Sequence, residues 1–398
     1  MIAKAALNRL KDAPWLRDSA TQRVFSLLDG ERGKTRAVGG AIRDTLVDHQ
    51  REITEIDFAT ELLPPEVMRR AGEAGVHAYP TGIEHGTVTL KIGDRVAEVT
   101  TLREDLETDG RRAVVRFGWG WTRDAERRDF TMNALYCDME GELFDPINGV
   151  EDCAAGIVRF IGDATRRIVE DRLRVYRFFR FTASHGHEQF DEDSLAAVRA
   201  ASNDLHAVSP ERVGAEMRRM LALPKVAHTL EVMSESGVME IPPALLERLG
   251  TYERRSHKPN GMARLAIFVQ ALGEKRLRQK WRLTNDEVDA AHAILKTAKM
   301  LIDFHISEAA YRYPAFLSDA VDVAATFAGW TEAGKSAVLQ HLSTIEVPKF
   351  PLSGNDLIER GMKPGPKIGA ELDRLEKQWI QSGFKLDRGG LLSILQTR

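Results

Sequence analysis

Residues 36–60 read Arg-Ala-Val-Gly-Gly-Ala-Ile-Arg-Asp-Thr-Leu-Val-Asp-His-Gln-Arg-Glu-Ile-Thr-Glu-Ile-Asp-Phe-Ala-Thr. The first three residues are typical of the end of a strand, and residues 41–47 are expected to begin a helix. Between them, Gly39 and Gly40 let the backbone approach a ligand closely, and the free N–H groups of a helix start favour an anion. The sequence therefore predicts a phosphate-binding turn here, although many glycine pairs before helices bind nothing.

Glu55 and Asp57 lie two positions apart in the second apolar run of this stretch. In a strand over residues 53–58, both side chains would leave the same face, roughly 6–7 Å apart. Such a pair can share hard divalent cations, whereas an isolated pair of this kind is usually part of a solvated strand face. Both interpretations remain open from these residues alone.

The composition indicates a globular protein of several domains. The chain has 398 residues, is 43% hydrophobic and carries a formal net charge of −3, so RNA would have to be held by a local basic face. No apolar run approaches the roughly 18 residues that span a bilayer, and residues 1–18 lack the apolar core of a secretory signal, so we expect a cytoplasmic location. Cys137 and Cys153 do not have zinc-ligand spacing and are expected to be buried thiols.

Hydrophobic periodicity predicts the main elements of the N-terminal third. Helices are expected over most of residues 1–35, and another helix is expected to begin at Pro64. Strands are expected over residues 86–92 and 95–102, on either side of a Gly-Asp turn. Beyond residue 205 the sequence is helical throughout, including a helix that starts at the Ser-Pro-Glu-Arg phrase.

Glu98 lies in the middle of the second of these strands, among apolar or β-branched neighbours. An acid at such a position either protects an edge strand or binds a ligand. Residues 104–122 are rich in glycine, arginine and aspartate, and we expect them to form a mobile loop. Trp119 and Trp121 in this segment could stack on a base, or they could anchor local packing.

Residues 170–180 place a charged side chain at every third position, in the pattern Glu-Asp-x-x-Arg-x-x-Arg-x-x-Arg. On one continuous helix this row would wind slowly along one face, over roughly 14 Å. The row is either a solvated face, stabilised by a pair between Glu170 and Arg174, or a surface that recognises a ligand.

Four motifs together resemble the nucleotidyltransferase superfamily, and more closely the class II CCA-adding enzymes, which share a head with bacterial poly(A) polymerases. They are Gly-Gly-x-x-Arg-Asp at residues 39–44 with the acid pair that follows, Glu-Val-Thr-Thr-Leu-Arg at 98–103, Arg-Arg-Asp-Phe-Thr-Met-Asn-Ala at 127–134, and Glu-Asp-x-x-Arg at 170–174. This sequence departs from the family pattern at Glu55, where the family has Asp, and at Arg172, where the family has Pro.

The resemblance implies an α+β fold and an enzyme. A nucleotidyltransferase head with a small mixed β-sheet and helices would occupy residues 1–140. An all-helical neck over residues 141–205 would recognise the base, and a helical body and tail over residues 206–398 would bind tRNA. Such an enzyme adds C, C and A to the 3′ end of tRNA from CTP and ATP, without a template, and releases pyrophosphate.

The resemblance also implies roles for individual residues. Glu55, Asp57 and Glu98 are expected to be catalytic and to hold a pair of Mg²⁺ ions. The nucleotide is expected to contact Gly39, Gly40, Arg43, Asp44, Arg128, Asn133, Asp171, Arg174, Arg177 and Arg180.

Three alternatives remain open from the sequence. A bacterial poly(A) polymerase shares the head, and a partial enzyme adds only CC or only A. A non-catalytic RNA-binding relative is the third, because Glu55 moves the carboxylate outward by one methylene. His-Gly-Thr at residues 85–87, which follows Gly82, is the pattern typical of CCA-adding relatives and favours CCA addition.

Overall fold

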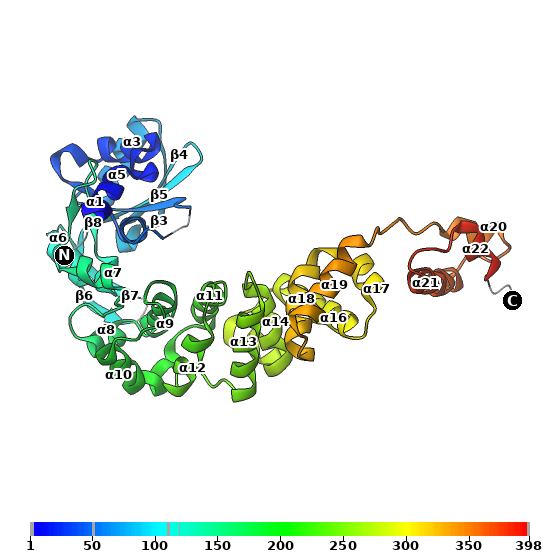
Figure 1. Cartoon of the computed structure of the whole chain (residues 1–398). Helices are drawn as coiled ribbons and strands as arrows, with labels where there is room; N and C mark the ends of the chain where they lie inside the picture. Colours follow the sequence, from blue (N-terminus) through cyan, green and yellow to red (C-terminus); the bar gives the residue numbers. More distant parts are fainter. Residues whose placement is uncertain (1–3, 50–51, 110–111, 119, 396–398) are drawn as a thin grey trace. The chain divides into compact units, whose positions relative to one another are not determined.

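The computed structural model describes residues 4–49, 52–109, 112–118 and 120–395, and for residues 104–109 and 112–116 only the course of the backbone (Figure 1). The chain forms two compact units. The first comprises Met1–Met220 and His228–Glu240, and the second comprises Leu221–Ala227 and Ile241–Arg398. The described strands all lie in the first unit, whereas the second is helical, so the α+β fold expected from the sequence is confirmed.

A seven-stranded mixed sheet, ordered β3-β4-β5-β2-β1-β8-β9, forms the centre of the first unit (Figure 1). Its strands are β1 (Thr35–Val38), β2 (Glu55–Thr60), β3 (His77–Gly82), β4 (Thr87–Ile92), β5 (Arg95–Thr101), β8 (Tyr136–Cys137) and β9 (Leu143–Phe144). Among these strands, β2 and β5 pair in parallel, and every other neighbouring pair is antiparallel. Gly93 has a φ of 59° between β4 and β5, which confirms the turn expected there.

The expected N-terminal helices are present and brace the helix that follows the glycine pair, α4 (Gly40–Leu46). Arg9 donates to the carbonyl oxygens of Thr45 and Leu46, at 2.8 Å each, and the Trp15 indole donates to Thr45 Oγ1 at 2.8 Å. The two Arg9 bonds reach carbonyl groups in the last turn of α4, where carbonyl groups lack a partner within the helix. Arg9 belongs to α1 (Lys4–Lys11) and Trp15 to α2 (Pro14–Arg17), and the other N-terminal elements are α3 (Ser19–Leu27) and the short 3-10 helix η1 (Gly30–Arg32).

The prediction of a loop over residues 104–122 is wrong, because most of this segment is regular secondary structure. The strands β6 (Arg103–Asp109) and β7 (Arg112–Phe117) form an antiparallel pair, and the helix α6 (Trp121–Glu126) follows. The expectation rested on the charged and glycine residues. However, residues 113–117 read Ala-Val-Val-Arg-Phe, and their β-branched and aromatic residues favour a strand.

Trp121 packs against the sheet, whereas Trp119 lies outside the described residues. The Trp121 ring lies 5.7 Å from the Tyr136 ring between centroids, and the Arg36 guanidinium lies 4.1 Å from its centre. The indole N–H also donates to Glu61 Oε1 at 3.2 Å. The geometry therefore favours an anchoring role for Trp121 over base stacking.

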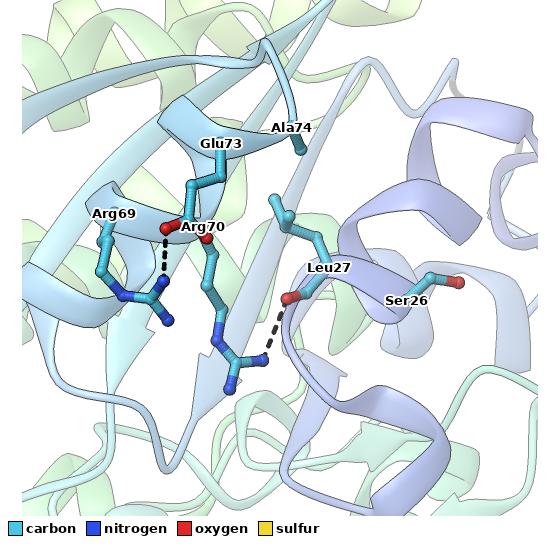
Figure 2. A pocket seen from close by; sticks show the side chains of 6 residues that line it. All are labelled: Ser26, Leu27, Arg69, Arg70, Glu73 and Ala74. Carbon is cyan, nitrogen blue, oxygen red and sulfur yellow. Dashed lines mark hydrogen bonds and ion pairs between the residues drawn. The ribbon is translucent and has the colours of Figure 1, made fainter.

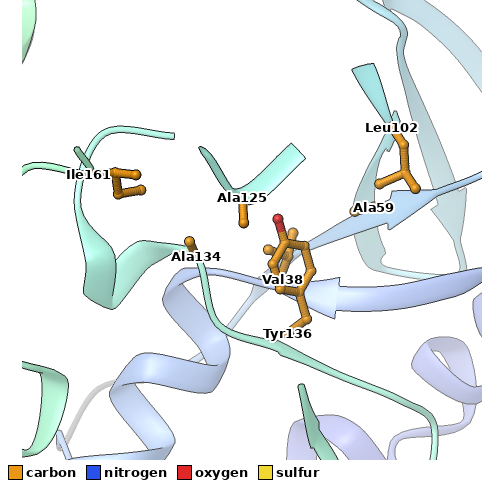
Figure 3. Packing of buried hydrophobic residues seen from close by; sticks show 7 residues of the cluster. All are labelled: Val38, Ala59, Leu102, Ala125, Ala134, Tyr136 and Ile161. Atoms are coloured by element: carbon orange, nitrogen blue, oxygen red, sulfur yellow. The ribbon is translucent and has the colours of Figure 1, made fainter. Parts of the chain in front are cut away.

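A small hydrophobic cluster holds the 127–134 motif next to the sheet (Figure 3). The Tyr136 ring belongs to this cluster, and its hydroxyl donates to Asp124 Oδ2 at 2.8 Å. Since Val38 directly precedes the glycine pair, the same cluster also fixes the strand that leads into the turn. The members are Val38, Ala59, Leu102, Ala125, Ala134, Tyr136 and Ile161.

Both cysteines are free and buried, Cys137 in β8 and Cys153 in the helix α7 (Gly149–Ala155), as expected from the sequence. Burial raises the pKa of Cys153 to about 12 and raises the pKa of Cys137 as well. Both side chains are therefore protonated thiols at neutral pH.

The continuous helix expected over residues 170–180 is broken at Asp171, which adopts an extended conformation with φ −152° and ψ 105°. The Asp171 carboxylate accepts a hydrogen bond from the N–H of Leu173 at 3.1 Å. This local bond is the kind by which aspartate competes with helix continuation. The helices of this region are α8 (Ala164–Glu170), α9 (Leu173–His185), α10 (Glu192–Ala201), η4 (Ser202–Ala207), α11 (Pro210–Leu221) and α12 (Ala227–Glu235).

The second unit is built around buried helices and one fully buried arginine. Arg264 donates to the carbonyl oxygens of Leu221, Leu223 and Pro224, and it pairs with Glu253 at 2.7 Å.

No helix in the described part of the chain is both long and apolar enough to cross a membrane. The elements are α13 (Pro243–Arg255), α14 (Gly261–Leu272), α15 (Glu274–Trp281), α16 (Asn285–Ile302), α17 (Ile306–Arg312), η5 (Pro314–Phe316), α18 (Leu317–Ala328), α19 (Glu332–Thr344), α20 (Gly354–Glu359), α21 (Pro366–Gln381) and α22 (Arg388–Ser393).

Gly149, at the start of α7, leaves no room for a side chain, because a Cβ there would lie 2.1 Å from the carbonyl oxygen of Thr131. Gly149→Ala should therefore lower the free energy of unfolding by about 1–3 kcal/mol, as overpacking does. Gly72→Ala, in α5 (Pro64–Glu73), is the matched control, because nothing lies within 4 Å of the new methyl group. It should raise stability by about 0.5 kcal/mol. Urea unfolding measures both changes, and a Gly149→Ala protein as stable as the wild type would contradict this packing.

Candidate active site

Three carboxylates lie on one face of the sheet, where β2 runs parallel to β5. Glu55 and Asp57 are exposed and flank the buried Ile56, and the register of the two strands places Asp57 beside Glu98. Partial burial raises the pKa of Glu98, and the negative charges of Asp57 and Glu55 raise it further. This effect shows that the three carboxylates are near enough to repel one another.

The chemistry of this donor set fits a hard divalent cation, which prefers carboxylate oxygens and would relieve the mutual repulsion. No group of three or more histidine, cysteine or acidic side chains in the described residues is already arranged as a metal centre. The carboxylates fit a divalent cation in chemical type and share one face, but in the described structure they do not form a three-ligand group.

The glycine pair forms a tight turn between β1 and α4. Gly39 has φ 79° and ψ −124°, a conformation that side chains disfavour, and its N–H donates to the carbonyl oxygen of Leu135 at 2.9 Å. A Cβ at Gly39 would lie 3.5 Å from the carbonyl oxygen of Asn133. Since Val38 pairs with Asp57, the turn emerges next to the carboxylates.

Arg43 and Asp44 lie beneath this turn, with exposed fractions of 5% and 1%. Arg43 donates twice to Asp44 Oδ1, from Nε at 2.8 Å and from Nη2 at 2.6 Å, and its Nη1 donates to Asn133 Oδ1 at 2.6 Å. All three were expected to contact the nucleotide. The structure brings them together below the surface as one buried polar group, and their contact with the nucleotide stays a prediction.

His185, from the end of α9, completes this buried group, and its Nε2 lies 2.9 Å from Asp44 Oδ1. Burial lowers the pKa of His185 to about 4, although the hydrogen bond to Asp44 acts in the opposite direction. The ring is therefore neutral at pH 7. Sequence analysis missed His185, because a single histidine near a helix end carries no recognisable pattern.

Arg128 is held by a buried acid rather than extended into solvent. Its guanidinium donates to Asp124 Oδ2 at 3.0 Å and to the Tyr136 hydroxyl at 3.1 Å. Burial alone would raise the pKa of Asp124, but the charges of Arg128 and Arg127 outweigh it and hold that pKa well below its usual range. Any phosphate bound by Arg128 would have to compete with this pair.

Asp171 is paired with Arg212 of α11. The guanidinium donates from Nη1 to Oδ1 at 3.1 Å and from Nη2 to Oδ2 at 2.7 Å, which is a two-point contact. Arg174, the expected neighbour of Asp171 on one helix face, instead donates to Glu170 Oε2 at 2.8 Å. Sequence analysis missed Arg212, since its phrase was interpreted only as the start of a helix.

Arg177 and Arg180 are also paired across elements. Arg177 Nε donates to Asp129 Oδ2 at 2.7 Å, and Arg180 Nε donates to Glu216 Oε2 of α11 at 2.6 Å. Burial alone would raise the pKa of Asp129, but Arg177 and further hydrogen bonds hold it at about 2. The row of arginines is therefore a partly buried seam between α9, α11 and the 127–134 motif, and not a solvated face.

Two cavities lie in the N-terminal region, and one of them is lined by none of these groups. The one in Figure 2 has a volume of about 410 Å³ and is lined by Ser26, Leu27, Arg69, Arg70, Glu73 and Ala74. Its arginines are already engaged: Arg69 donates to Glu73 at 2.6 Å, and Arg70 donates to the carbonyl oxygen of Leu27 at 3.2 Å. The second, of about 550 Å³, lies where Trp15 and Thr45 meet, and it borders the buried polar group because Asp44 also lines it.

Comparison with known families assigns the sheet and its site to one class. Residues 35–159 match the family model of the poly A polymerase head domain, and residues 189–247 match a probable RNA and SrmB-binding site of polymerase A. The fold, the glycine turn and the adjacent carboxylates thus define a nucleotidyltransferase of the poly(A) polymerase type.

Comparison with individual relatives identifies the family within this class. The chain is 33% identical over 374 residues to the mitochondrial CCA tRNA nucleotidyltransferase 1 of Danio rerio, covering 90% of this chain and 86% of the relative. It is 36% identical over 271 residues to the CCA-adding enzyme of Geobacillus thermodenitrificans, covering 65% of each. The crystal structure of the Bacillus stearothermophilus CCA-adding enzyme in complex with CTP superposes with a TM-score of 0.75 at 27% identity, over 92% of this chain and 94% of that one. The chain belongs to the family of CCA-adding tRNA nucleotidyltransferases.

The lowered pKa of His185 predicts a pH dependence of stability. Between pH 6.5 and about 4, the unfolded chain binds a proton at this histidine that the native state excludes, so this residue favours unfolding as the pH falls. His185→Gln should remove the effect, because glutamine does not titrate. Urea unfolding from pH 7 to pH 4 should show the wild type losing stability relative to the variant, and parallel curves would contradict a neutral buried imidazole.

Proposed function

We propose that this protein adds C, C and A to the 3′ end of tRNA from CTP and ATP, without a template, and releases pyrophosphate. The observation that carries the proposal is the placement of Glu55, Asp57 and Glu98 on one sheet face beside the glycine turn. Membership of the CCA-adding family supports the choice of tRNA and of these two nucleotides.

Glu55, Asp57 and Glu98 would hold the divalent cation, for which we propose Mg²⁺. The bound cation supplies Lewis-acid polarisation of the reacting oxygen and phosphate groups. The reaction joins the terminal 3′ hydroxyl oxygen of tRNA to the α-phosphorus of the nucleotide, while the bond to pyrophosphate breaks and the hydroxyl proton is lost. Gly39 and Gly40 contribute a turn whose backbone leaves room for phosphate oxygens near these carboxylates.

Base selection is assigned to Asp171 and Arg174. Cytosine and adenine both present an amino donor beside a ring acceptor, whereas uracil and guanine present a carbonyl oxygen instead of the amino group. A carboxylate has about four acceptor positions, of which Arg212 and the N–H of Leu173 take three, so roughly one remains for an amino group. Arg174 uses three of its donors on protein groups, which leaves about two for the base.

The remaining assignments extend the proposal to the whole chain. We assign catalysis to residues 1–140, base recognition to residues 141–205 and tRNA binding to residues 206–398. The match to an RNA-binding region covers residues 189–247, so it overlaps the end of the second range and the start of the third. We propose that the protein is cytoplasmic, the location expected from the sequence. The vertebrate relatives carry mitochondrial names, so cell fractionation is the direct test of this assignment.

The central test uses tRNA lacking its CCA end, with CTP and ATP supplied singly and together. We expect C incorporation first, A only afterwards, and no further growth. Asp57→Ala should reduce this activity to below about 1% because it removes a charged ligand of the cation. Asp94→Ala, an exposed acid in the β4–β5 turn, is the control and should remain active. Long A ladders would show a poly(A) polymerase. Addition of only CC or only A would show a partial enzyme, and the absence of any product from the wild type would show a binding protein.

Asp171→Ala should lower the use of CTP and ATP together and relax the rejection of UTP and GTP by about tenfold to a hundredfold, the value of one good two-point contact. Arg212→Ala should produce a weaker effect in the same direction, because Asp171 loses the partner that aligns it. Arg166→Ala is the control, since that side chain is 74% exposed on α8. The measurement is kcat/KM for each of the four nucleotides, and unchanged selectivity in Asp171→Ala would move base choice elsewhere.

A further inference from the structure

A buried polar network connects α4 to α9 through six side chains: His185, Asp44, Arg43, Asn133, Asp129 and Arg177. We call it the α4–α9 network. Both of its ends belong to α9, since His185 closes that helix and Arg177 lies two turns earlier. The middle of the network comes from α4 and from the 127–134 motif. It therefore attaches one helix to the head at two separate points.

The network is continuous in hydrogen bonds. His185 donates to Asp44, and Asp44 accepts from Arg43, whose Nη1 donates to Asn133 Oδ1 at 2.6 Å. Asn133 Nδ2 then donates to Asp129 Oδ1 at 3.1 Å. Arg177 donates to the other oxygen of the same carboxylate, at 2.7 Å. No step exceeds the length of an ordinary hydrogen bond.

His185 is the member that the proposed chemistry does not otherwise use. Its side chain is 7% exposed, and its ring stacks on His49 at 5.0 Å with an angle of 20° between the planes. Because Asp44 can only accept, Nε2 must carry the proton, and Nδ1 of the neutral ring then accepts from the Ser184 hydroxyl at 2.6 Å. Asp44 thus selects the tautomer, and the Ser184 hydroxyl supplies the hydrogen bond that Nδ1 accepts in it.

The two functional ends of the site meet in this network. At one end Arg43 holds Asn133, whose carbonyl oxygen lies against the Gly39 turn. At the other end Asp129 holds Arg177, and the negative charge of Asp171 also acts on that arginine. The phosphate turn and the base-reading segment therefore share one set of buried hydrogen bonds.

We propose that His185 is a positioning residue: by fixing Asp44 and Arg43, it sets the phosphate turn and the base-reading residues of α9 in one register. The inference rests on the proposed function, because that register matters only if one nucleotide occupies both places. His185 itself touches neither nucleotide nor tRNA. Its effect passes through the α4–α9 network, in which each buried group depends on its neighbour for a partner.

The test compares three variants of the full-length protein. His185→Leu keeps the bulk but removes the donor, and His185→Gln restores an N–H near the position of Nε2. Thr182→Val is the matched control, because the buried Thr182 hydroxyl on the same helix has no hydrogen-bond partner in the described structure. Ser184→Ala removes only the hydroxyl that contacts Nδ1 of His185, and it takes the place of His185→Leu if that variant fails to fold.

We expect His185→Leu to raise KM for CTP and for ATP by about tenfold while kcat changes by less than about threefold, because binding to both ends of the site is weakened. Glutamine should recover most of the loss, and Thr182→Val should match the wild type. If His185→Leu only lowers the melting temperature and leaves both KM values unchanged, the residue is structural and the inference fails.

A double-mutant cycle tests whether the α4–α9 network couples the phosphate turn to the base-reading residues. The pair His185→Leu and Arg177→Lys should lose less kcat/KM than the product of the single losses, since both break the same network. Independent losses would overturn the coupling of the two ends. In long-range ¹H–¹⁵N spectra, His185 should show the Nε2–H tautomer, and the other tautomer would also overturn the inference. A wild-type protein that incorporates no nucleotide contradicts the proposed function instead, and the spectra separate the two failures.

Discussion

The parallel pairing of β2 with β5 is the constraint on which the site depends. Two parallel neighbours cannot be joined by a tight turn, so the chain between them must leave the sheet and return. It leaves through α5 and returns by adding β3 and β4 to the same sheet, before β5 pairs with β2 in the register that places Asp57 beside Glu98. A slip of one residue would point Glu98 to the opposite face. The hydrophobic alternation of both strands is therefore what keeps the carboxylates together.

The arginines of this protein are mostly engaged before any substrate arrives. Arg128 holds the carboxylate of Asp124, four residues earlier, whereas Arg177 and Arg212 each hold a carboxylate from another part of the fold. Removing one partner of such a pair leaves an uncompensated charge, which is costly where the side chains are buried. A nucleotide can thus recruit these groups only through the donors and acceptors that remain, and this requirement favours a ligand of defined shape over general attraction to phosphate.

Local sequence patterns predicted the elements whose determinants are adjacent in the chain. The β4–β5 hairpin, the helix starting at Pro64 and the acid pair on β2 all follow from neighbouring residues. The failures have tertiary causes. Asp171 interrupts a helix that the charge spacing favours because its carboxylate serves Leu173 and Arg212, and no local pattern reveals the latter. In the same way, the motif that contains Arg43 and Asp44 gives no sign that His185 and Asn133 contact them inside the protein.

The two buried cysteines have a practical consequence for work in solution. Thiol reagents react with exposed thiolates, and Cys137 and Cys153 offer neither, because burial both shields them and raises their pKa. A cysteine introduced on the surface of either compact unit would then be the reactive one, without prior removal of the native pair. Fluorophores attached in this way could report on the distance between the two units during each round of synthesis.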